Sequence, residues 1–147
     1  KTFMLKKNEE LKIMDAIAIN RKHASIKVNI NHFASKTIEV FKGPEFEFLS
    51  SEQQKILFKK AFTISKENNR MAYQLNESFA NNLKPIITSS VLPGTVQLTP
   101  SGKLIVLMRD SQTTGGYPRV LQLKETAINI LSQKFTGQEI AFKWLDY

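Results

Sequence analysis

The sequence contains no cysteine among its 147 residues. This absence excludes a cysteine nucleophile, an iron–sulfur cluster and a zinc site with cysteine ligands, and it removes any disulfide argument for secretion. The chain also lacks an apolar run of the ~20 residues that a membrane-spanning helix needs, and residues 1–20 lack the continuous apolar segment of a signal peptide. We therefore expect a cytoplasmic protein that does not contact a membrane.

Several motifs of catalysis and cofactor binding are also missing. No Gly-x-Ser-x-Gly elbow is present to hold an activated serine, and no Walker A run is present to cradle the phosphates of ATP. The two histidines, His23 and His32, lie nine residues apart without a carboxylate cluster, which is not the spacing of metal ligands. We interpret them as solvated histidines of amino-terminal strands, and we expect no metal site.

The formal net charge of +8 raises the question of nucleic-acid binding. However, residues 1–60 carry twelve basic and seven acidic side chains and the remainder nine and six, so the charge is spread along the chain. Seventeen lysines against four arginines indicate a compositional bias that fills solvated positions with lysine. We therefore expect no nucleic-acid partner.

Short segments rich in Ile, Val, Phe and Thr alternate with turn signals along the chain, which is typical of β-strands. The expected strands are residues 25–30, 37–41, 62–64, 71–75, 86–87, 95–98, 104–108 and 139–144. Leu98 to Leu104 encloses Pro100 and Gly102 and predicts a hairpin.

Two segments instead predict short helices. Ser50 with Gln53 three residues later is a capping-box pattern, and Leu57/Ala61 and Phe58/Phe62 follow at a spacing of four. Residues 124–132 place Ala127, Ile128 and Leu131 on one face. Many short strands with two covering helices favour a mainly β fold, a closed or nearly closed β-barrel over residues 21–147. Residues 1–20 are interpreted as a linker or an entering strand.

The segment from Leu104 to Tyr117 is the strongest candidate for a binding site. A run of apolar residues ends abruptly in Arg109 and Asp110, so a buried strand delivers a charged pair to its end. The loop that follows contains Gln112, Thr113, Thr114, Gly115, Gly116 and Tyr117. Glycines let a backbone approach a ligand closely, Gln and Thr donate and accept hydrogen bonds, and the Arg109 fork fits a carboxylate. The alternative is a hairpin turn with Thr-rich edges.

These residues resemble those of one known family. The resemblance is carried by residues 89–98, the Pro100-Ser101-Gly102 turn, residues 110–118, residues 69–75 and residues 40–45. The chain is identified as a member of the biotin-dependent carboxyltransferase family, which includes the C subunit of 5-oxoprolinase, the KipI antagonist and allophanate hydrolase subunit 2. Ala72 and Gln74 depart from the family pattern, so the edge of the pocket is expected to differ.

The resemblance implies a cyclophilin-like closed barrel that forms the carboxy-terminal half of a longer, two-domain protein. No counterpart of the family's amino-terminal half is found, and the first residue, Lys1, is not Met. The implied partners are that missing half, a KipI-like B-type subunit and an A-type subunit. The resemblance also implies a small amide or lactam substrate bound by residues that include Arg70, Gln97, Arg109, Asp110 and the loop 112–117, whereas no catalytic residue is identified.

The resemblance leaves several functions open. As part of a 5-oxoprolinase, the chain would hold no cofactor itself, ATP would be used by the assembled complex, and the isolated chain would be inactive. Alternatives are a KipI-antagonist-like regulator, a carboxyltransferase domain of a biotin-dependent urea carboxylase and, from the fold alone, a peptidyl-prolyl isomerase. Biotin belongs only to the carboxylase alternative, because the chain has no Met-Lys-Met type hairpin to carry it. If the loop touches a ligand, Gly115 or Gly116 should have a positive φ or no room for a Cβ atom. The loop should also line a concave surface near Gln97 and Arg70.

Overall fold

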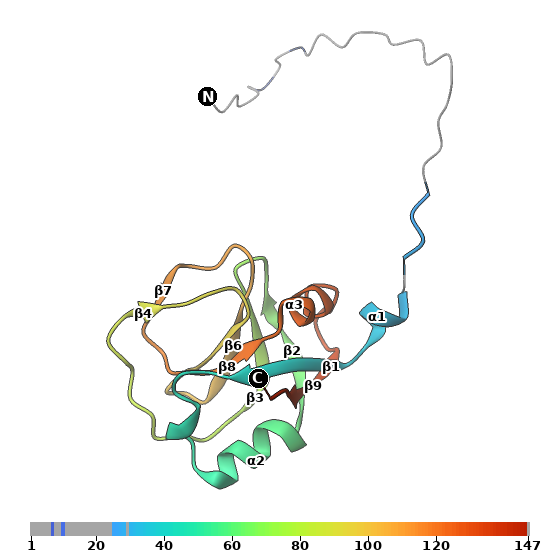
Figure 1. Ribbon diagram of the computed structural model, residues 1–147. Helices are drawn as coiled ribbons and strands as arrows, with labels where there is room; N and C mark the ends of the chain where they lie inside the picture. Colours follow the sequence, from blue (N-terminus) through green and yellow to red (C-terminus); the bar gives the residue numbers. More distant parts are fainter. Residues whose placement is uncertain (1–6, 8–9, 11–24, 29, 147) are drawn as a thin grey trace, which may run out of the picture.

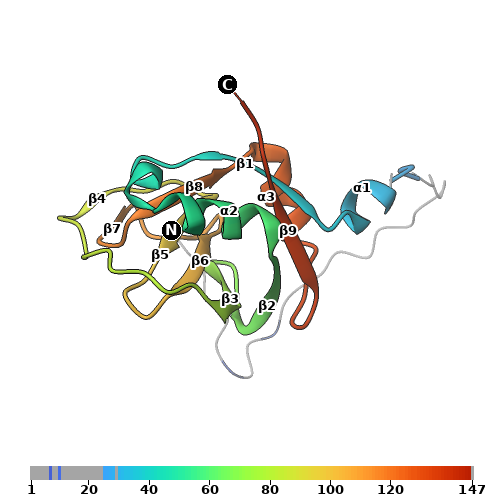
Figure 2. The same cartoon turned by 90° about the horizontal axis from the view of Figure 1, so that it is seen from below.

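The computed structural model describes residues 7, 10, 25–28 and 30–146. Its strands are β1 (Thr37–Lys42), β2 (Ala61–Asn68), β3 (Ala72–Ser78), β4 (Ser89–Ser90), β5 (Thr95–Leu98), β6 (Lys103–Leu107), β7 (Thr114–Gly115), β8 (Arg119–Leu123) and β9 (Glu139–Trp144). Seven of them form a closed barrel in the order β1-β8-β5-β6-β3-β2-β9 (Figures 1 and 2). Strands β1 and β9 run parallel and close the barrel, whereas the other neighbouring pairs are antiparallel. The predicted mainly β, closed-barrel fold is confirmed.

The barrel interior is filled by alternate residues of each strand, because successive side chains of a strand point to opposite faces. Ile38 and Val40 of β1 are fully buried, and so are Phe62 and Ile64 of β2. Strand β5 differs, since all four of its residues are buried. Its outward side chains therefore lie beneath another layer of the chain, which is the candidate loop and the segment that precedes β5.

The helices are α1 (Ile30–Ala34), α2 (Ser51–Lys59) and α3 (Glu125–Leu131), with a 3-10 turn η1 (Phe46–Phe48). Figure 1 shows α3 above the barrel and α2 below it. The capping box that begins α2 is confirmed: the Ser50 hydroxyl accepts from the Gln53 amide at 3.2 Å, and the Gln53 side chain accepts from the Ser50 amide at 2.8 Å. In α3, the predicted apolar face is confirmed, because Ala127, Ile128 and Leu131 are buried.

The predicted hairpin between Leu98 and Leu104 is also confirmed. These two residues face each other across the antiparallel pair β5–β6. Gly102 has a φ of +83°, a left-handed conformation that favours glycine, and its amide donates to the Thr99 carbonyl at 2.9 Å. The turn thus needs its glycine for backbone geometry.

Two predicted strands are wrong. Residues 25–28 form no strand, and residue 29 lies outside the described residues; α1 then begins at Ile30. The alternating apolar side chains Ile26 and Ile30 are 86% and 74% exposed, so the pattern is present without a partner strand. Residues 86–87 are irregular as well, because Ile86 makes one backbone bond to Gly116 and Ile87 is 93% exposed.

Three further details differ from expectation. Helix α2 ends at Lys59, and Ala61 and Phe62 belong to β2, because Phe62 pairs with Ile140 of β9 and its ring packs in the core. Strand β8 is an addition to the predicted set, since its adjacent apolar residues do not alternate. His32 lies in α1 rather than in a strand, whereas His23 lies outside the described residues, as does most of the 1–20 segment.

No helix within the described ranges is long and apolar enough to cross a membrane.

Candidate functional site

The candidate loop leaves the barrel at the end of β6 and returns at β8, and its backbone is fixed along the way. The Val91 amide donates to the Thr113 carbonyl at 3.0 Å, and the Ile86 amide donates to the Gly116 carbonyl at 2.9 Å. Between these bonds, β4 and β7 form a small antiparallel sheet that pairs Ser89 with Gly115. The loop and the 86–91 segment therefore form one tied layer over the outer face of β5.

Gly115 lies directly against Gln97, an outward-facing residue of β5 that is only 2% exposed. A Cβ atom on Gly115 would overlap the Gln97 side-chain amide, and it would stand 3.3 Å from a Val91 methyl group. Among the residues that the structure describes, a Cβ on Gly116 would meet only the Ile86 carbonyl oxygen at 3.6 Å, an ordinary contact. Neither glycine has a positive φ. Of the paired glycines, Gly115 is the one that lacks room, as the sequence predicted for at least one of them.

Arg70 and Asp110 meet at the start of the loop. The Arg70 Nε donates to one Asp110 oxygen at 2.6 Å and an Nη donates to the other at 3.2 Å, a two-pronged pair. Their backbones are also joined, because the Asp110 amide donates to the Arg70 carbonyl at 3.0 Å. The hydrogen bond from Arg70 holds the pKa of the Asp110 carboxyl below its usual value. Both groups are therefore charged at neutral pH.

Arg109, which the sequence predicted to bind a carboxylate, has a partner within the chain. Its Nη2 donates to Glu125 of α3 at 2.5 Å and to the Asn129 side chain, also on α3, at 3.4 Å. The side chain is 49% exposed. Arg109 therefore ties the end of β6 to α3.

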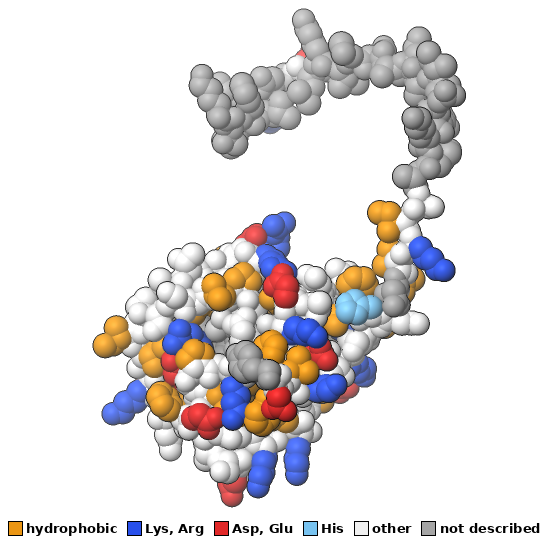
Figure 3. Space-filling view, in the orientation of Figure 1, with side chains coloured by type: hydrophobic (Ala, Val, Ile, Leu, Met, Phe, Trp, Pro, Cys, Tyr) orange, Lys and Arg blue, Asp and Glu red, His pale blue; other side chains and the backbone are white. Residues whose placement is uncertain are grey.

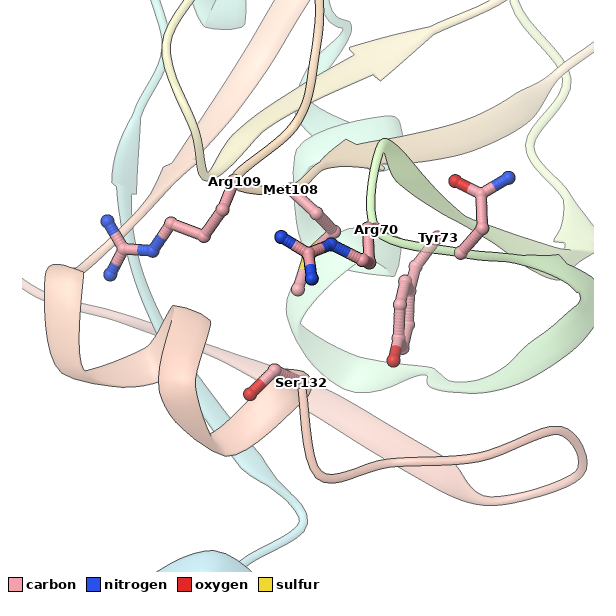
Figure 4. A pocket seen from close by; sticks show the side chains of 6 residues that line it. Arg70, Tyr73, Met108, Arg109 and Ser132 are labelled. Atoms are coloured by element: carbon pink, nitrogen blue, oxygen red, sulfur yellow. The ribbon is translucent and has the colours of Figure 1, made fainter. Parts of the chain in front are cut away.

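A cavity of about 340 Å³ opens beside the two arginines. It is lined by Asn69, Arg70, Tyr73, Met108, Arg109 and Ser132. Figure 4 shows Arg70 between Met108 and Tyr73, whereas Arg109 extends toward α3. The loop residues 112–117 do not line this cavity, so the expectation that the loop lines a concave surface beside both Gln97 and Arg70 is not confirmed here; the loop lies against Gln97 instead.

The structure thus places the predicted site residues in two groups joined by the loop. Arg70 and Arg109 line the cavity and Asp110 is paired with Arg70, whereas Gln97 lies under Gly115 and donates to the Tyr117 carbonyl at 3.4 Å. Between them, Gln112, Thr113 and Thr114 are exposed, and among the described residues their side chains make no hydrogen bond. A fixed backbone with free polar side chains is suited to contacting an external ligand.

Sequence reasoning missed an ion pair that supports the loop, between Glu45 and Arg119. The Arg119 Nη2 and Nε donate to the two Glu45 carboxylate oxygens at 2.7 and 2.9 Å, and an Nη1 donates to the Ser90 carbonyl at 2.9 Å. The side chains are 12% and 19% exposed for Glu45 and Arg119. The Arg119 hydrogen bond lowers the Glu45 pKa, whereas burial works in the opposite direction. This pair links the turn after β1 to the loop layer.

Gly43 explains why the turn after β1 can approach β8 so closely. A Cβ atom at this position would overlap the carbonyl oxygen of Arg119. The Gly43 amide donates to the Val120 carbonyl at 3.0 Å, and the Glu45 amide donates to the Arg119 carbonyl at 3.2 Å. The Gly-Pro-Glu run is the signal that could have indicated this contact, although its partner is far away in the sequence.

Charged side chains are mixed on the face shown in Figure 3, where lysines and arginines lie among acidic and apolar residues. Several lysines are paired with carboxylates, for example Lys42 with Glu47 at 2.7 Å and Lys124 with Glu39 at 3.0 Å. On the face shown in Figure 3, the basic side chains therefore do not form one continuous basic patch.

The family described as carboxyltransferase domain, subdomain A and B, matches residues 2–144, and the chain belongs to this family. Over 107 residues it is 35% identical to the 5-oxoprolinase C subunit of Escherichia coli, a match that covers 71% of this chain and 34% of that protein. The corresponding protein of Haemophilus influenzae is 28% identical over 108 residues, covering 72% and 35%.

The chain therefore spans about a third of the length of these curated relatives. Among solved structures, the urea carboxylase of Kluyveromyces lactis superposes with a TM-score of 0.69 at 16% identity, covering 75% of this chain and 11% of that one. At this identity the likeness shows the fold alone.

Proposed function

We propose that this chain is a component of the C type in an ATP-dependent 5-oxoprolinase, in which it contributes part of the substrate site. The observation that carries the proposal is its 35% identity over 107 residues to the 5-oxoprolinase C subunit of Escherichia coli. In this interpretation, ATP is used by the assembled complex, and the lactam of 5-oxoproline is opened to glutamate.

The proposed substrate contacts are Arg70 and the loop Gln112 to Tyr117, whereas Asp110 positions Arg70 and the buried Gln97 supports the loop from beneath. Free amide and hydroxyl groups suit the lactam, because they can both donate and accept hydrogen bonds. We assign Arg109 a different part, since its guanidinium already joins β6 to α3 through Glu125. The remaining walls of the site would come from an amino-terminal half and from the A-type and B-type subunits.

Two alternatives remain distinct in chemistry. A KipI-antagonist-like regulator would bind its inhibitor partner and turn over nothing. A carboxyltransferase of a urea carboxylase would depend on a biotin-carrying chain, and membership of the family described as carboxyltransferase domain is what favours this alternative. The three candidate functions therefore differ in the substrate that is turned over, if any, and in whether biotin is required.

Reconstitution tests the proposal. We expect ATP-dependent conversion of 5-oxoproline to glutamate when the chain is combined with the amino-terminal half of its own subunit and with the A-type and B-type subunits. Omission of the chain should abolish turnover, and the chain alone should be inactive, because it holds only part of the site. Biotin-dependent carboxylation of urea by the same assembly, without 5-oxoproline turnover, would favour the carboxylase alternative instead.

A further inference from the structure

The geometry points to the cavity beside Arg70 as a binding site for a small organic carboxylate. Arg70 would bind the carboxylate, Asp110 would position Arg70, and Arg109 would not take part. The chemical class of the ligand follows from the cavity, whereas its identification as 5-oxoproline rests on the proposed function.

Arg70 is held in place with its outer edge free. A guanidinium has five N–H donors, and Asp110 accepts from the edge formed by Nε and one Nη. The other edge, formed by the two terminal nitrogens, makes no hydrogen bond to the residues that the structure describes. The Arg70 side chain is 85% exposed and lines the cavity. A ligand carboxylate can therefore bind this free edge through two parallel hydrogen bonds.

The other polar groups of the cavity are already engaged. The Tyr73 hydroxyl donates to the Lys134 carbonyl at 3.3 Å, and the Ser132 hydroxyl donates to the Asn129 carbonyl at 2.7 Å. The Asn69 side-chain oxygen accepts from the amides of residues 71 and 72, which leaves its NH₂ group as a donor. The unengaged groups are thus mainly donors, and a site rich in donors selects an anion.

The floor of the cavity favours an organic anion. Met108 and Tyr73 line the cavity, and although they are only 4% and 9% exposed, the thioether and the ring supply the apolar surface beside the guanidinium. A small carbon skeleton can cover that surface while its carboxylate reaches Arg70, and burial of apolar area then adds to the charged hydrogen bonds. Inorganic anions lack the carbon part.

Arg109 serves as the natural comparison within the same cavity. Its Nη2 is shared between Glu125 and Asn129, and Figure 4 shows the side chain extending toward α3, away from Tyr73. Lysine keeps the positive charge at either position but loses the planar fork. Substitution of each arginine by lysine therefore separates recognition by the fork from attraction by charge.

The test is an NMR titration of the chain with three ligands of the same ring size. These are 5-oxoproline, cyclopentanecarboxylate, which lacks the lactam, and 2-pyrrolidinone, which lacks the carboxylate. We expect both carboxylates to bind at the cavity and pyrrolidinone to bind about tenfold more weakly or worse, a difference of about 1.4 kcal/mol. Arg70→Lys should weaken carboxylate binding by about tenfold or more, whereas Arg109→Lys should change it by no more than about twofold.

The role of Asp110 in positioning Arg70 is tested by a second substitution. Asp110→Asn should weaken carboxylate binding in wild-type Arg70 but have little effect in the Arg70→Lys background, because the fork to be aligned is then absent. Equal binding of pyrrolidinone and 5-oxoproline, no binding of either carboxylate at millimolar concentration, or unchanged binding after Arg70→Lys would each overturn the inference. None of these results would depend on hydrolysis by the assembled complex, so the proposed function would be judged separately.

Discussion

Replacement of Arg119 by methionine is expected to lower the free energy of unfolding of the barrel by about 3–5 kcal/mol, the range for breaking a buried ion pair from one side. Methionine preserves much of the volume but leaves the Glu45 carboxylate without its partner in a site where that side chain is 12% exposed. It also removes the hydrogen bond to the Ser90 carbonyl, which helps to hold the loop layer. Chemical denaturation at neutral pH measures the effect.

The pH dependence of that difference provides an internal check. The Glu45 pKa is lowered from its ordinary value of 4.5, so the pair stabilises the folded state at neutral pH, and the stabilisation is lost as the pH falls through the lowered pKa. The gap between wild type and Arg119→Met should therefore shrink in acid. Arg70→Met is the control, because the exposed Arg70–Asp110 pair is screened by solvent and its loss should barely change stability. Equal losses for the two variants would contradict the assignment of Arg119.

Replacement of Gly115 by alanine is expected to reduce turnover of 5-oxoproline in the assembled complex by about tenfold or more, which corresponds to about 1.4 kcal/mol. The new methyl group would displace the Gln97 amide from beneath the loop, because the two would overlap. Gln97 would then lose its contact with the Tyr117 carbonyl, and an unpaired buried amide costs about 1–3 kcal/mol. The loop would shift while the barrel stays folded.

Gly116→Ala is the matched control for this prediction. An added Cβ would meet one carbonyl oxygen at 3.6 Å within the described part of the chain, and the Gly116 φ is not positive, so turnover should change by no more than about twofold. Steady-state kinetics of both variants, together with their thermal midpoints, separate a displaced loop from a destabilised barrel. A larger loss of turnover for Gly116→Ala than for Gly115→Ala would contradict the assignment of Gly115 as the glycine on which the position of the loop depends.

The sequence predicted those parts of the fold that depend on local patterns. The capping box at Ser50 and the turn glycine at Gly102 form through contacts within a few residues, so their motifs are sufficient to indicate them. The alternating residues 25–30 have the same kind of pattern as a strand, but pairing requires a neighbouring edge, and the closed barrel of the described residues provides none. The sequence pattern of a strand does not show whether the fold provides a neighbouring strand for it to pair with.

The sequence predicted which residues form the candidate site, but it did not predict which side chains pair with one another. The loop and both arginines could be selected from residue type, because polar groups gather directly after a buried strand. The partner of Arg109, Glu125, and the partner of Arg119, Glu45, become neighbours only when α3 and the turn after β1 fold onto the barrel. Which arginine extends toward α3 (Figure 4), and which glycine lacks room, are consequences of that packing.

A structure of the assembled complex with 5-oxoproline and a non-hydrolysable ATP analogue would show where the substrate binds. We expect the ligand at the end of the barrel that carries the candidate loop, with its carboxylate on the free edge of Arg70. Contacts to the side chains of Gln112, Thr113 or Thr114 should complete the site on this chain. A ligand bound elsewhere in the complex, touching neither Arg70 nor the loop, would contradict this expectation.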